Sequence, residues 1–490
     1  MRTLARKSLA WVLAVLLAVG VWGMAGVSLS TVSAATNGDY TYTTLSDGTL
    51  SITGYTGSER DLVIPAQLDG IPVTSISNNA FQDNSALYSV VIPEGITEIG
   101  AQAFYGCGNL ADIDLPSTLE SVAANSFEET ACFNNPNRWF NGCLYLEDVL
   151  LCAYPETPTN LKVWDNTRII AGGAAAYSTN LTGLVLPDSV EFMGEGAFAY
   201  CTALTSVTLS DGMETIPAAA FALCTELREI FLPDSLRVIG ESAFAGDVSL
   251  GAMVLPDSLE LVEAGAFELC TGLSFYGHAG TYAQQYANSN GFPFLVIADG
   301  LPFMDVAPSG VYYTEAVQYV YGEGLMTGMN PTTFAPAENL SRAHFATILY
   351  RMAGSPSVAG MENPFEDNYY MENFYYNAAI WCNNAGILTG YYNPDGSFTG
   401  RFGPSDNITR EQLATMLYRY ADYIGADTSA RTSLDGFGDG SAVSSFAVEA
   451  LEWAAAEGIV SGRLTTPPTI APQDNASRAD TAVMIQRFLV

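Results

Sequence analysis

Three arginines in the C-terminal part of the chain stand where a positive charge is unfavourable. Arg342, Arg410 and Arg478 are 68 residues apart, and each directly follows a serine or threonine at the start of a helical apolar pattern. A helix N-terminus carries partial positive charge, so an arginine there destabilises the helix by about 1 kcal/mol or less. Either of two arrangements would offset this: an ion pair with one of the 52 acidic residues, or an anion shared by the guanidinium and the free backbone N–H groups. The repetition favours the second arrangement, a carboxylate or phosphate site.

The flanking residues predict a helix at each of these positions. The Ser or Thr is a favourable N-cap, and Thr409 with Gln412 would form a capping box. Apolar residues then recur at the spacing of one helix face, as at Leu413, Met416 and Leu417. A second arginine follows nine residues after each first one, near the helix C-terminus, where positive charge is favourable and needs no functional explanation. These arginines are Arg351, Arg419 and Arg487.

A similar front half precedes each of these helices. The segments FMDV, FEDN and FGDG place Asp305, Asp367 and Asp439 near the start of each unit. A predicted helix then ends in a glycine-containing turn. The turn glycines are Gly328, Gly390 and Gly462, and an aromatic residue lies nine residues before each of them, at Tyr319, Trp381 and Trp453. Each unit is therefore predicted to run helix, glycine turn, irregular loop, helix.

This pattern resembles that of S-layer homology domains, three in tandem over residues 302–356, 363–425 and 435–490. The F-x-D opening, the aromatic residue, the glycine turn and Thr-Arg-Glu at 409–411 carry the resemblance. It implies an all-α bundle with pseudo-threefold symmetry that binds secondary cell-wall polysaccharide, in many cases a pyruvylated one whose ketals carry carboxylates. It also implies that the grooves between units hold the glycan. The glycan-binding residues that we expect from it are Arg342, Arg410, Arg478, Asp305, Asp367, Asp439, Gly328, Gly390, Gly462, Trp381 and Trp453.

The three units depart from the family pattern to different degrees. The first has Tyr319 where the others have tryptophan, and His344 where the motif has glutamate. The third has Asp480 one position late. We therefore expect the groove that contains Arg410 to be the principal site, with the other two adding multivalent binding.

The N-terminal part of the chain has a different repeat. Phe81, Phe104 and Phe127 are 23 residues apart, and so are Phe198, Phe221, Phe244 and Phe267. A short apolar strand that ends in proline recurs in the same register, as in VVIPEG, LVLPDS and IFLPDS. Such a period predicts a solenoid whose coils must stack to bury their apolar sides. The whole chain is then an α+β multidomain protein: a β-solenoid with 23-residue coils, followed by an all-α bundle.

Cysteines follow the same register. Cys107, Cys201, Cys224 and Cys270 each lie three residues after a repeat phenylalanine, which indicates small core residues rather than a disulfide framework. Cys132, Cys143 and Cys152 lie elsewhere, in an insertion at about 132–158 that reads as a hairpin with Glu147-Asp148 at its turn. Whether those three form a bridge stays open. A hairpin before the first coil and a helix with a strand after the last would cap the solenoid, which spans residues 36–298.

These repeats resemble the BspA-type leucine-rich repeats of bacterial surface proteins, most clearly at AFYGCGNLADIDLP and AFALCTELREIFLP. The resemblance implies surface adhesion, with a host or matrix protein, or a neighbouring cell-surface ligand, as partner. On each strand, the residue before the final apolar position should face outward. This candidate ligand face consists of Val91, Asp114, Val185, Thr208, Phe231 and Val254. Ordinary strand propensity is the alternative explanation for its apolar members.

Charge and the N-terminal segment bear on location. With 18 basic and 52 acidic residues, the net charge is −34, which would repel nucleic acid and anionic membranes. Residues 1–35 read as a signal peptide with a basic start, an apolar stretch and a small-residue cleavage site. An uncleaved membrane anchor over residues 9–29 is the alternative. We expect secretion to the wall or S-layer surface of a Gram-positive bacterium, with no membrane association after cleavage.

The sequence gives no sign of catalysis. Only two histidines occur, and no metal-ligand spacing, phosphate loop or nucleophile motif is present. We therefore expect no enzyme activity, no catalytic residues, no cofactor and no metal site. Two rival functions stay open: a structural S-layer component whose solenoid serves lattice packing, and a wall-processing enzyme.

Overall fold

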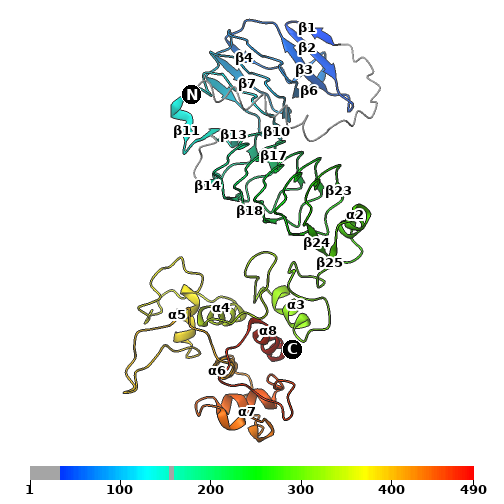
Figure 1. Cartoon of the computed structure of the whole chain (residues 1–490). Helices are drawn as coiled ribbons and strands as arrows, with labels where there is room; N and C mark the ends of the chain where they lie inside the picture. Colours follow the sequence, from blue (N-terminus) through cyan, green and yellow to red (C-terminus); the bar gives the residue numbers. More distant parts are fainter. Residues whose placement is uncertain (1–33, 154–158) are drawn as a thin grey trace. The chain divides into compact units, whose positions relative to one another are not determined.

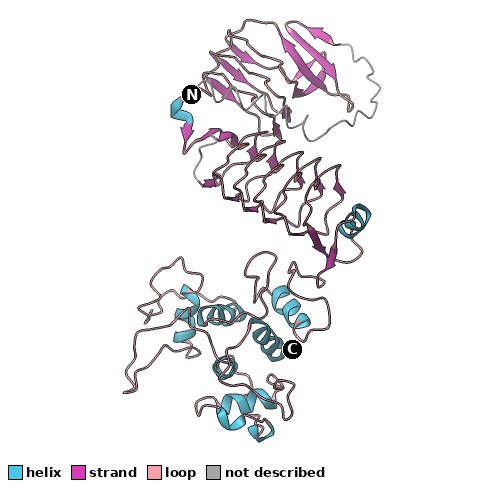
Figure 2. Ribbon diagram, viewed as in Figure 1, coloured by secondary structure: helices cyan, strands magenta, loops and turns pink. Residues whose placement is uncertain are grey.

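The computed structural model describes residues 34–153 and 159–490, which form two compact units that divide between Leu295 and Val296. The predicted signal peptide falls almost entirely on residues 1–33, outside the described residues. No helix within the described ranges is long and apolar enough to cross a membrane. Figure 2 shows short strands along the first unit and α-helices in the second, with loops and turns between them in both.

The first unit is the predicted solenoid (Figure 1). It begins with an antiparallel cap of β1 (Ala35–Asn37), β2 (Tyr40–Thr44) and β3 (Leu50–Tyr55). Each following coil contributes two short strands, one to each of two ladders, and the paired strands of each ladder are divided among three separate sheets. The first ladder contains β4 (Asp61–Val63), β7 (Ser89–Val91), β9 (Asp112–Asp114), β14 (Asn160–Lys162), β16 (Gly183–Val185), β18 (Ser206–Thr208), β20 (Glu229–Phe231) and β22 (Ala252–Val254). The second contains β6 (Ile71–Ile76), to which β5 (Gln67–Leu68) pairs, β8 (Glu98–Ile99), β10 (Ser121–Val122), β15 (Ile169–Ile170), β17 (Phe192–Met193), β19 (Thr215–Ile216), β21 (Val238–Ile239) and β23 (Leu261–Val262).

Stacked phenylalanines form the solenoid core. The ring centroids of Phe198 and Phe221 lie 5.7 Å apart, and the next pairs toward Phe267 lie 5.6 and 5.3 Å apart, all nearly parallel. Phe81, Phe104 and Phe127 form the same stack in the first coils. Because strand pairing advances by one 23-residue coil, as in Val207↔Ile230, each ring meets its own equivalent in the next coil.

All eight cysteines are free thiols. The four in the repeat register are buried, and each Sγ donates to a backbone carbonyl of the preceding coil, as Cys224 Sγ does to Phe198 O at 3.2 Å. The core interpretation of these cysteines is therefore confirmed. Asp247 takes the same register position in its coil and is fully buried, with Oδ1 accepting the Cys224 N–H at 2.7 Å.

The insertion contains a hairpin, and a helix between two strands follows the last coil. A short 3-10 helix (Pro136–Arg138) leads to β11 (Trp139–Phe140), β12 (Cys143–Leu146) and β13 (Val149–Ala153). The last two pair antiparallel with Leu146 opposite Val149, which puts Glu147 and Asp148 at the turn. At the other end, β24 (Ser274–Gly277), α2 (Tyr282–Asn290) and β25 (Phe294–Val296) close the solenoid (Figure 1).

The second unit is an all-α bundle in which the helices pair between repeats. The first repeat supplies α3 (Thr314–Gly322) and α4 (Arg342–Met352), the second α5 (Tyr376–Asn384) and α6 (Arg410–Tyr423), and the third α7 (Val448–Ala456) and α8 (Arg478–Leu489). Two 3-10 turns, Leu434–Gly436 and Gly440–Ala442, open the third repeat. The packed pairs are α4 with α5, α6 with α7, and α8 with α3. Each packed pair therefore combines the second helix of one repeat with the first helix of the next, and the third repeat pairs in this way with the first.

Candidate functional site

The helix N-termini begin where the sequence predicts. Helices α4, α6 and α8 start at Arg342, Arg410 and Arg478, capped by Ser341, Thr409 and Ser477. The capping box of Thr409 and Gln412 is present in full. These three starts meet at the centre of the bundle through backbone bridges that pair each cap segment with the others.

Each of the three arginines reaches into the following repeat and is at least 92% buried, with residue exposures of 5%, 8% and 5%. Arg342 Nε donates to Phe402 O at 2.8 Å, Arg410 Nε to Ile470 O at 2.8 Å, and Arg478 Nε to Phe334 O at 2.7 Å. In two of them Nη2 makes a second bond to the glycine turn, to Thr389 O at 2.8 Å and to Thr327 O at 2.6 Å. The arginines therefore fasten each helix start to the loop of the next repeat.

The backbone N–H groups at these helix starts are already bonded. Arg342 N donates to Asp406 O at 2.9 Å and Ala343 N to Pro404 O at 3.1 Å, and the other two helices repeat both bonds. This corrects the expectation that these N–H groups and the guanidinium would face one anion. The loop of the next repeat satisfies the N–H groups instead, so any anion must be held by side chains.

The opening aspartates complete the same junctions. Asp367 accepts from Phe402 N at 2.7 Å and Gly403 N at 2.8 Å, while Asp305 and Asp439 make the equivalent pairs of bonds in their own repeats. Phe402, Phe334 and Ile470 therefore each give their N–H to an aspartate and their C=O to an arginine. The predicted Arg and Asp residues are brought together around one loop residue in each groove.

The turn glycines are needed because the turn is crowded. A Cβ at Gly328 would lie 2.2 Å from Asn330 O, and one at Gly390 would lie 2.5 Å from Arg401 O. Gly462 has φ +80°, a conformation that favours glycine. These glycines let the turn approach the arginine, and they offer no side chain to a ligand.

The three arginines differ in their charged neighbours. Arg410 Nη1 lies 2.9 Å from Asp480 Oδ2, and Tyr312 Oη donates to the other Asp480 oxygen at 3.0 Å. Arg342 and Arg478 have no carboxylate within ion-pair distance among the described residues. The ion pair that the sequence left open as an alternative to an anion site is therefore present at Arg410. Arg342 and Arg478 form no such pair with a described residue.

Aromatic rings take the place of the carboxylate in those two grooves. The Arg342 guanidinium lies 4.8 Å from the Tyr391 ring centroid and 5.5 Å from that of Phe402, and the Arg478 guanidinium lies 4.5 Å from that of Phe334. Burial lowers the pKa of both guanidinium groups, partly opposed by more distant carboxylates. Arg401, which is exposed and lies 3.4 Å from Asp406 Oδ2, places a second guanidinium beside Tyr391 in the first of these grooves.

Comparison with known families agrees with both repeats. Residues 69–147 and 154–274 match the BspA type leucine rich repeat region, in 6 copies. Residues 302–346, 371–414 and 436–482 match the S-layer homology domain. The chain contains a BspA-type leucine-rich repeat region and three S-layer homology domains. Both families are non-catalytic, and together they indicate a cell-surface protein anchored to the cell wall.

Individual relatives share only part of their length with this leucine-rich repeat protein. An endoglucanase of Bacillus sp. is 30% identical over 192 residues, which are 39% of this chain and 19% of the relative. The S-layer protein EA1 of Bacillus anthracis is 29% identical over 149 residues, 29% of this chain and 16% of the relative. The chain thus spans less than a fifth of the length of these curated relatives. Neither aligned stretch is much longer than the S-layer homology region alone.

Solved leucine-rich repeat structures are also similar to part of the chain. A leucine-rich cell surface protein of Faecalibacterium prausnitzii is 22% identical, covering 52% of this chain and 97% of its own, with a TM-score of 0.30. The leucine-rich repeat protein of T. pallidum is 26% identical, covering 44% and 91%, with a TM-score of 0.23.

The tryptophans of the S-layer homology domains are not in the grooves. Trp381 and Trp453 are each 2% exposed. Trp381 packs against Tyr350 and Tyr423, and Trp453 against Tyr418. This corrects their assignment to glycan contact: they fill the interfaces between helices of neighbouring repeats, where no sugar ring reaches.

The predicted face of the leucine-rich repeats is present but uneven. Val185, Thr208 and Phe231 are neighbours along the first ladder, as are Val91 and Asp114. Val185 is 67% exposed and Val91 37%, whereas Thr208, Phe231 and Val254 are partly buried. These residues form a narrow strip that lines neither of the two pockets beside the inserted hairpin.

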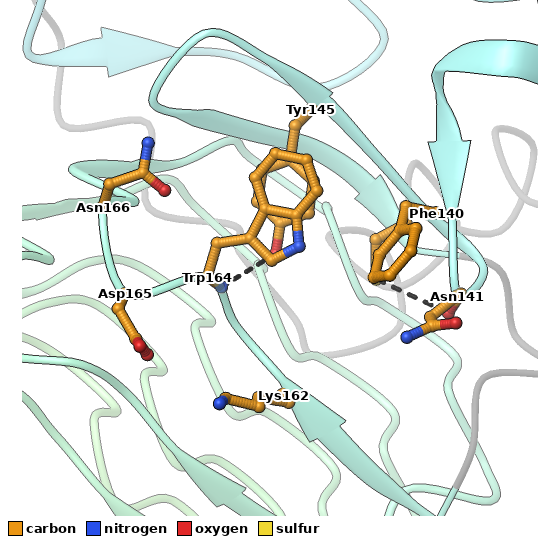
Figure 3. Close-up of a pocket in the computed structure, with 8 residues that line it drawn as sticks. Phe140, Asn141, Tyr145, Lys162, Trp164, Asp165 and Asn166 are labelled. Atoms are coloured by element: carbon orange, nitrogen blue, oxygen red, sulfur yellow. Dashed lines mark hydrogen bonds between the residues drawn. The ribbon is translucent and has the colours of Figure 1, made fainter.

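A pocket beside the inserted hairpin escaped the sequence analysis. It encloses about 530 Å³ and is lined by Phe140, Asn141, Cys143, Tyr145, Lys162, Trp164, Asp165 and Asn166 (Figure 3). The sequence does carry a sign of this pocket, because the insertion breaks the 23-residue register and contains several aromatic residues. Its lining comes from the insertion itself and from residues 162–166 that follow it, and no local pattern connects the two segments.

Proposed function

We propose that the S-layer homology domains hold this protein to a secondary cell-wall polysaccharide that carries pyruvate ketals, and that the Arg342 groove is the principal site. The observation that carries the proposal is that no carboxylate of the described residues lies within ion-pair distance of Arg342, although the chain has 52 acidic residues. A buried guanidinium with hydrogen-bonding capacity left over is a receptor for a carboxylate. Tyr391 and Arg401 at the same groove would add a ring face and a second charge.

The ranking of the grooves follows from Asp480. Its carboxylate already bonds Arg410, at the position where a ligand carboxylate would bind. The Arg410 groove, which the sequence favoured, is therefore proposed as the weakest site. The Arg478 groove, which has an aromatic partner but no second arginine beside the ring, ranks between them.

In this proposal, the three aspartates and three glycines shape the grooves by holding the loops, without touching the sugar. The solenoid is displayed outward for adhesion to a host, matrix or neighbouring cell-surface partner. The protein acts without catalysis or cofactor, at the wall of a Gram-positive cell. The similarity to S-layer protein EA1 supports a second candidate, a structural S-layer component. Assembly of the purified protein into sheets would favour that candidate.

The test is co-sedimentation of residues 36–490 with purified Gram-positive cell walls, compared with walls stripped of secondary polysaccharide. Stripping should abolish binding. Arg342→Gln should weaken it about tenfold, because a charge-assisted hydrogen bond is lost. The matched control is Arg351→Gln, in the same helix, which also donates to a backbone carbonyl but lies outside the groove.

Asp480→Asn supplies a test with the opposite sign. It keeps the size of the side chain but frees the Arg410 guanidinium, so wall binding should tighten several-fold. Wall binding that is indifferent to stripping, to Arg342→Gln and to Asp480→Asn would contradict the proposal and leave the three arginines as structural fasteners.

A further inference from the structure

We infer that the pocket beside the inserted hairpin is a binding site for an uncharged oligosaccharide. The inference deepens the proposed display function of the solenoid, because it names the class of ligand and the residues that would hold it. It does not depend on the wall-binding grooves, which lie in the other unit.

The floor of the pocket is a fixed aromatic stack. The indole of Trp164 lies on the Tyr145 ring with centroids 3.9 Å apart and planes 8° from parallel. Tyr145 is buried, and its Oη accepts the Trp164 backbone N–H at 3.3 Å, so the stack is held from behind. In Figure 3 the indole covers Tyr145 and its other face is not covered by any residue drawn. Trp164 is 37% exposed.

A second ring stands at an angle to this floor. Phe140 lies at the end of β11, is 56% exposed, and has its centroid 6.1 Å from Trp164 with the planes 58° apart. The two rings form an open wedge rather than a closed core contact. A sugar ring presents a flat face of C–H groups that packs on such aromatic surfaces.

The polar residues of the lining are uncommitted. The side chains of Asn141, Lys162, Asp165 and Asn166 make no hydrogen bond or ion pair with any other described residue. They supply donors and acceptors together: two amides, an ammonium and a carboxylate. Sugar hydroxyls need both kinds of partner at the edge of the stacked ring. A purely apolar ligand would leave all four polar groups unused.

Charge selects an uncharged ligand. Lys162 is the only lysine after Lys7, and its charge is balanced by Asp165 in the same lining. The chain as a whole carries −34, which repels anionic polymers, including nucleic acids whose bases also stack on aromatic rings. A volume of about 530 Å³ lies within the range of ordinary ligand pockets.

The test is isothermal titration of residues 36–490 with cellotetraose, xylotetraose, mannotetraose and chitotetraose, and with tetragalacturonate as the anionic comparison. At least one uncharged tetrasaccharide should bind with micromolar to millimolar Kd. Trp164→Ala should weaken that binding about tenfold or more, and Phe140→Ala by a smaller factor. The matched control is Phe446→Ala, because Phe446 is 55% exposed but lies in the helical unit.

Trp164→Phe guards against a folding artefact, since it keeps a stacking ring and should retain much of the affinity. Absence of binding by all four uncharged sugars at millimolar concentration would overturn the inference. So would binding that ignores both Trp164→Ala and Phe140→Ala. Preferential binding of tetragalacturonate would overturn the assignment to an uncharged ligand. Wall co-sedimentation of the same Trp164→Ala protein should be unchanged, so failure here and failure of the wall anchor give different results.

Discussion

The solenoid and the helical bundle are both built from repeats, but the solenoid is an open stack of coils and the bundle is a closed ring. The solenoid adds coils in one direction, so each Phe ring meets the next and both ends need a cap. The bundle closes on itself: α4 packs on α5, α6 on α7, and α8 returns to α3. In an open stack, each inner coil packs only against the coil before it and the coil after it. A closed ring makes three repeats one folding unit.

The chemistry of the repeated contacts differs as well. In the solenoid the repeated contact is apolar, and a buried thiol accompanies it. In the bundle it is polar, an Asp and an Arg joined through one loop residue. Apolar contacts tolerate small changes of side-chain shape. A buried polar group that loses its hydrogen-bond partner lowers the free energy of unfolding.

The largest expected effect tests the open stack. Phe221→Ala should destabilise the solenoid by roughly 3–5 kcal/mol, since it removes a fully buried ring between two others. Chemical denaturation followed by circular dichroism should show the strand-rich unit unfolding earlier. Phe140→Ala, at an exposed ring, is the control and should leave that transition in place. Loss of bundle stability in Phe221→Ala would contradict the independence of the two units.

The next effect tests the closed ring. Asp367→Ala should destabilise the bundle by about 3 kcal/mol, because two backbone N–H groups lose a charged acceptor. Hydrogen exchange should then accelerate in all three repeats together. Asp395→Ala, in an exposed loop of the same repeat, should have little effect. Faster exchange confined to the second repeat would argue against a single cooperative ring.

A smaller effect concerns Asp247, which stands at the repeat position where four other coils have a buried cysteine. Burial raises the pKa of Asp247 to about 9, so the folded state holds a proton that the unfolded chain releases near its ordinary value of 3.8. The contribution of Asp247 to solenoid stability should therefore be most favourable below about pH 4 and be lost as the pH rises toward 9. Asp247→Cys restores the repeat residue and should stabilise the solenoid by about 2 kcal/mol at neutral pH. Thermal melts of the two proteins from pH 4 to 9 should converge at the acidic end; parallel curves would show that Asp247 does not titrate in this way.

The smallest effect concerns the caps. Thr409→Ala should destabilise the bundle by about 1 kcal/mol, since the side chain satisfies the Gln412 N–H. Ser341→Ala and Ser477→Ala should cost a similar amount if the three junctions are equivalent. Thermal denaturation of the three variants measures this. A markedly larger loss at one cap would mean that the ring has one dominant junction.

Much of the fold was predictable because residues that recur at fixed intervals along the sequence specify it. The 23-residue step of the phenylalanines and the Ser/Thr-Arg starts of the helices are local patterns, and the structure has both. The inserted hairpin followed from alternation around Glu147-Asp148.

The candidate site was less predictable because partners come from different repeats. That Asp480 would pair with Arg410, 70 residues earlier, depends on how the ring closes. The same closure buries Trp381 and Trp453, which the motif alone presents as groove residues. The aromatic pocket joins Phe140 of the insertion to Trp164 of the coil that follows it, and no periodicity links them.

One feature of the ring bears on how the protein carries load. Leu340 N donates to Ala476 O, Ala476 N to Ile408 O, and Ile408 N to Leu340 O, so three backbone bonds form a closed circuit at the centre of the bundle. The chain enters the bundle beside α3, and α3 is clasped by α8, the last helix. A pull on the chain at residue 296 therefore acts on the contact between α3 and α8, which joins the first helix of the bundle to the last.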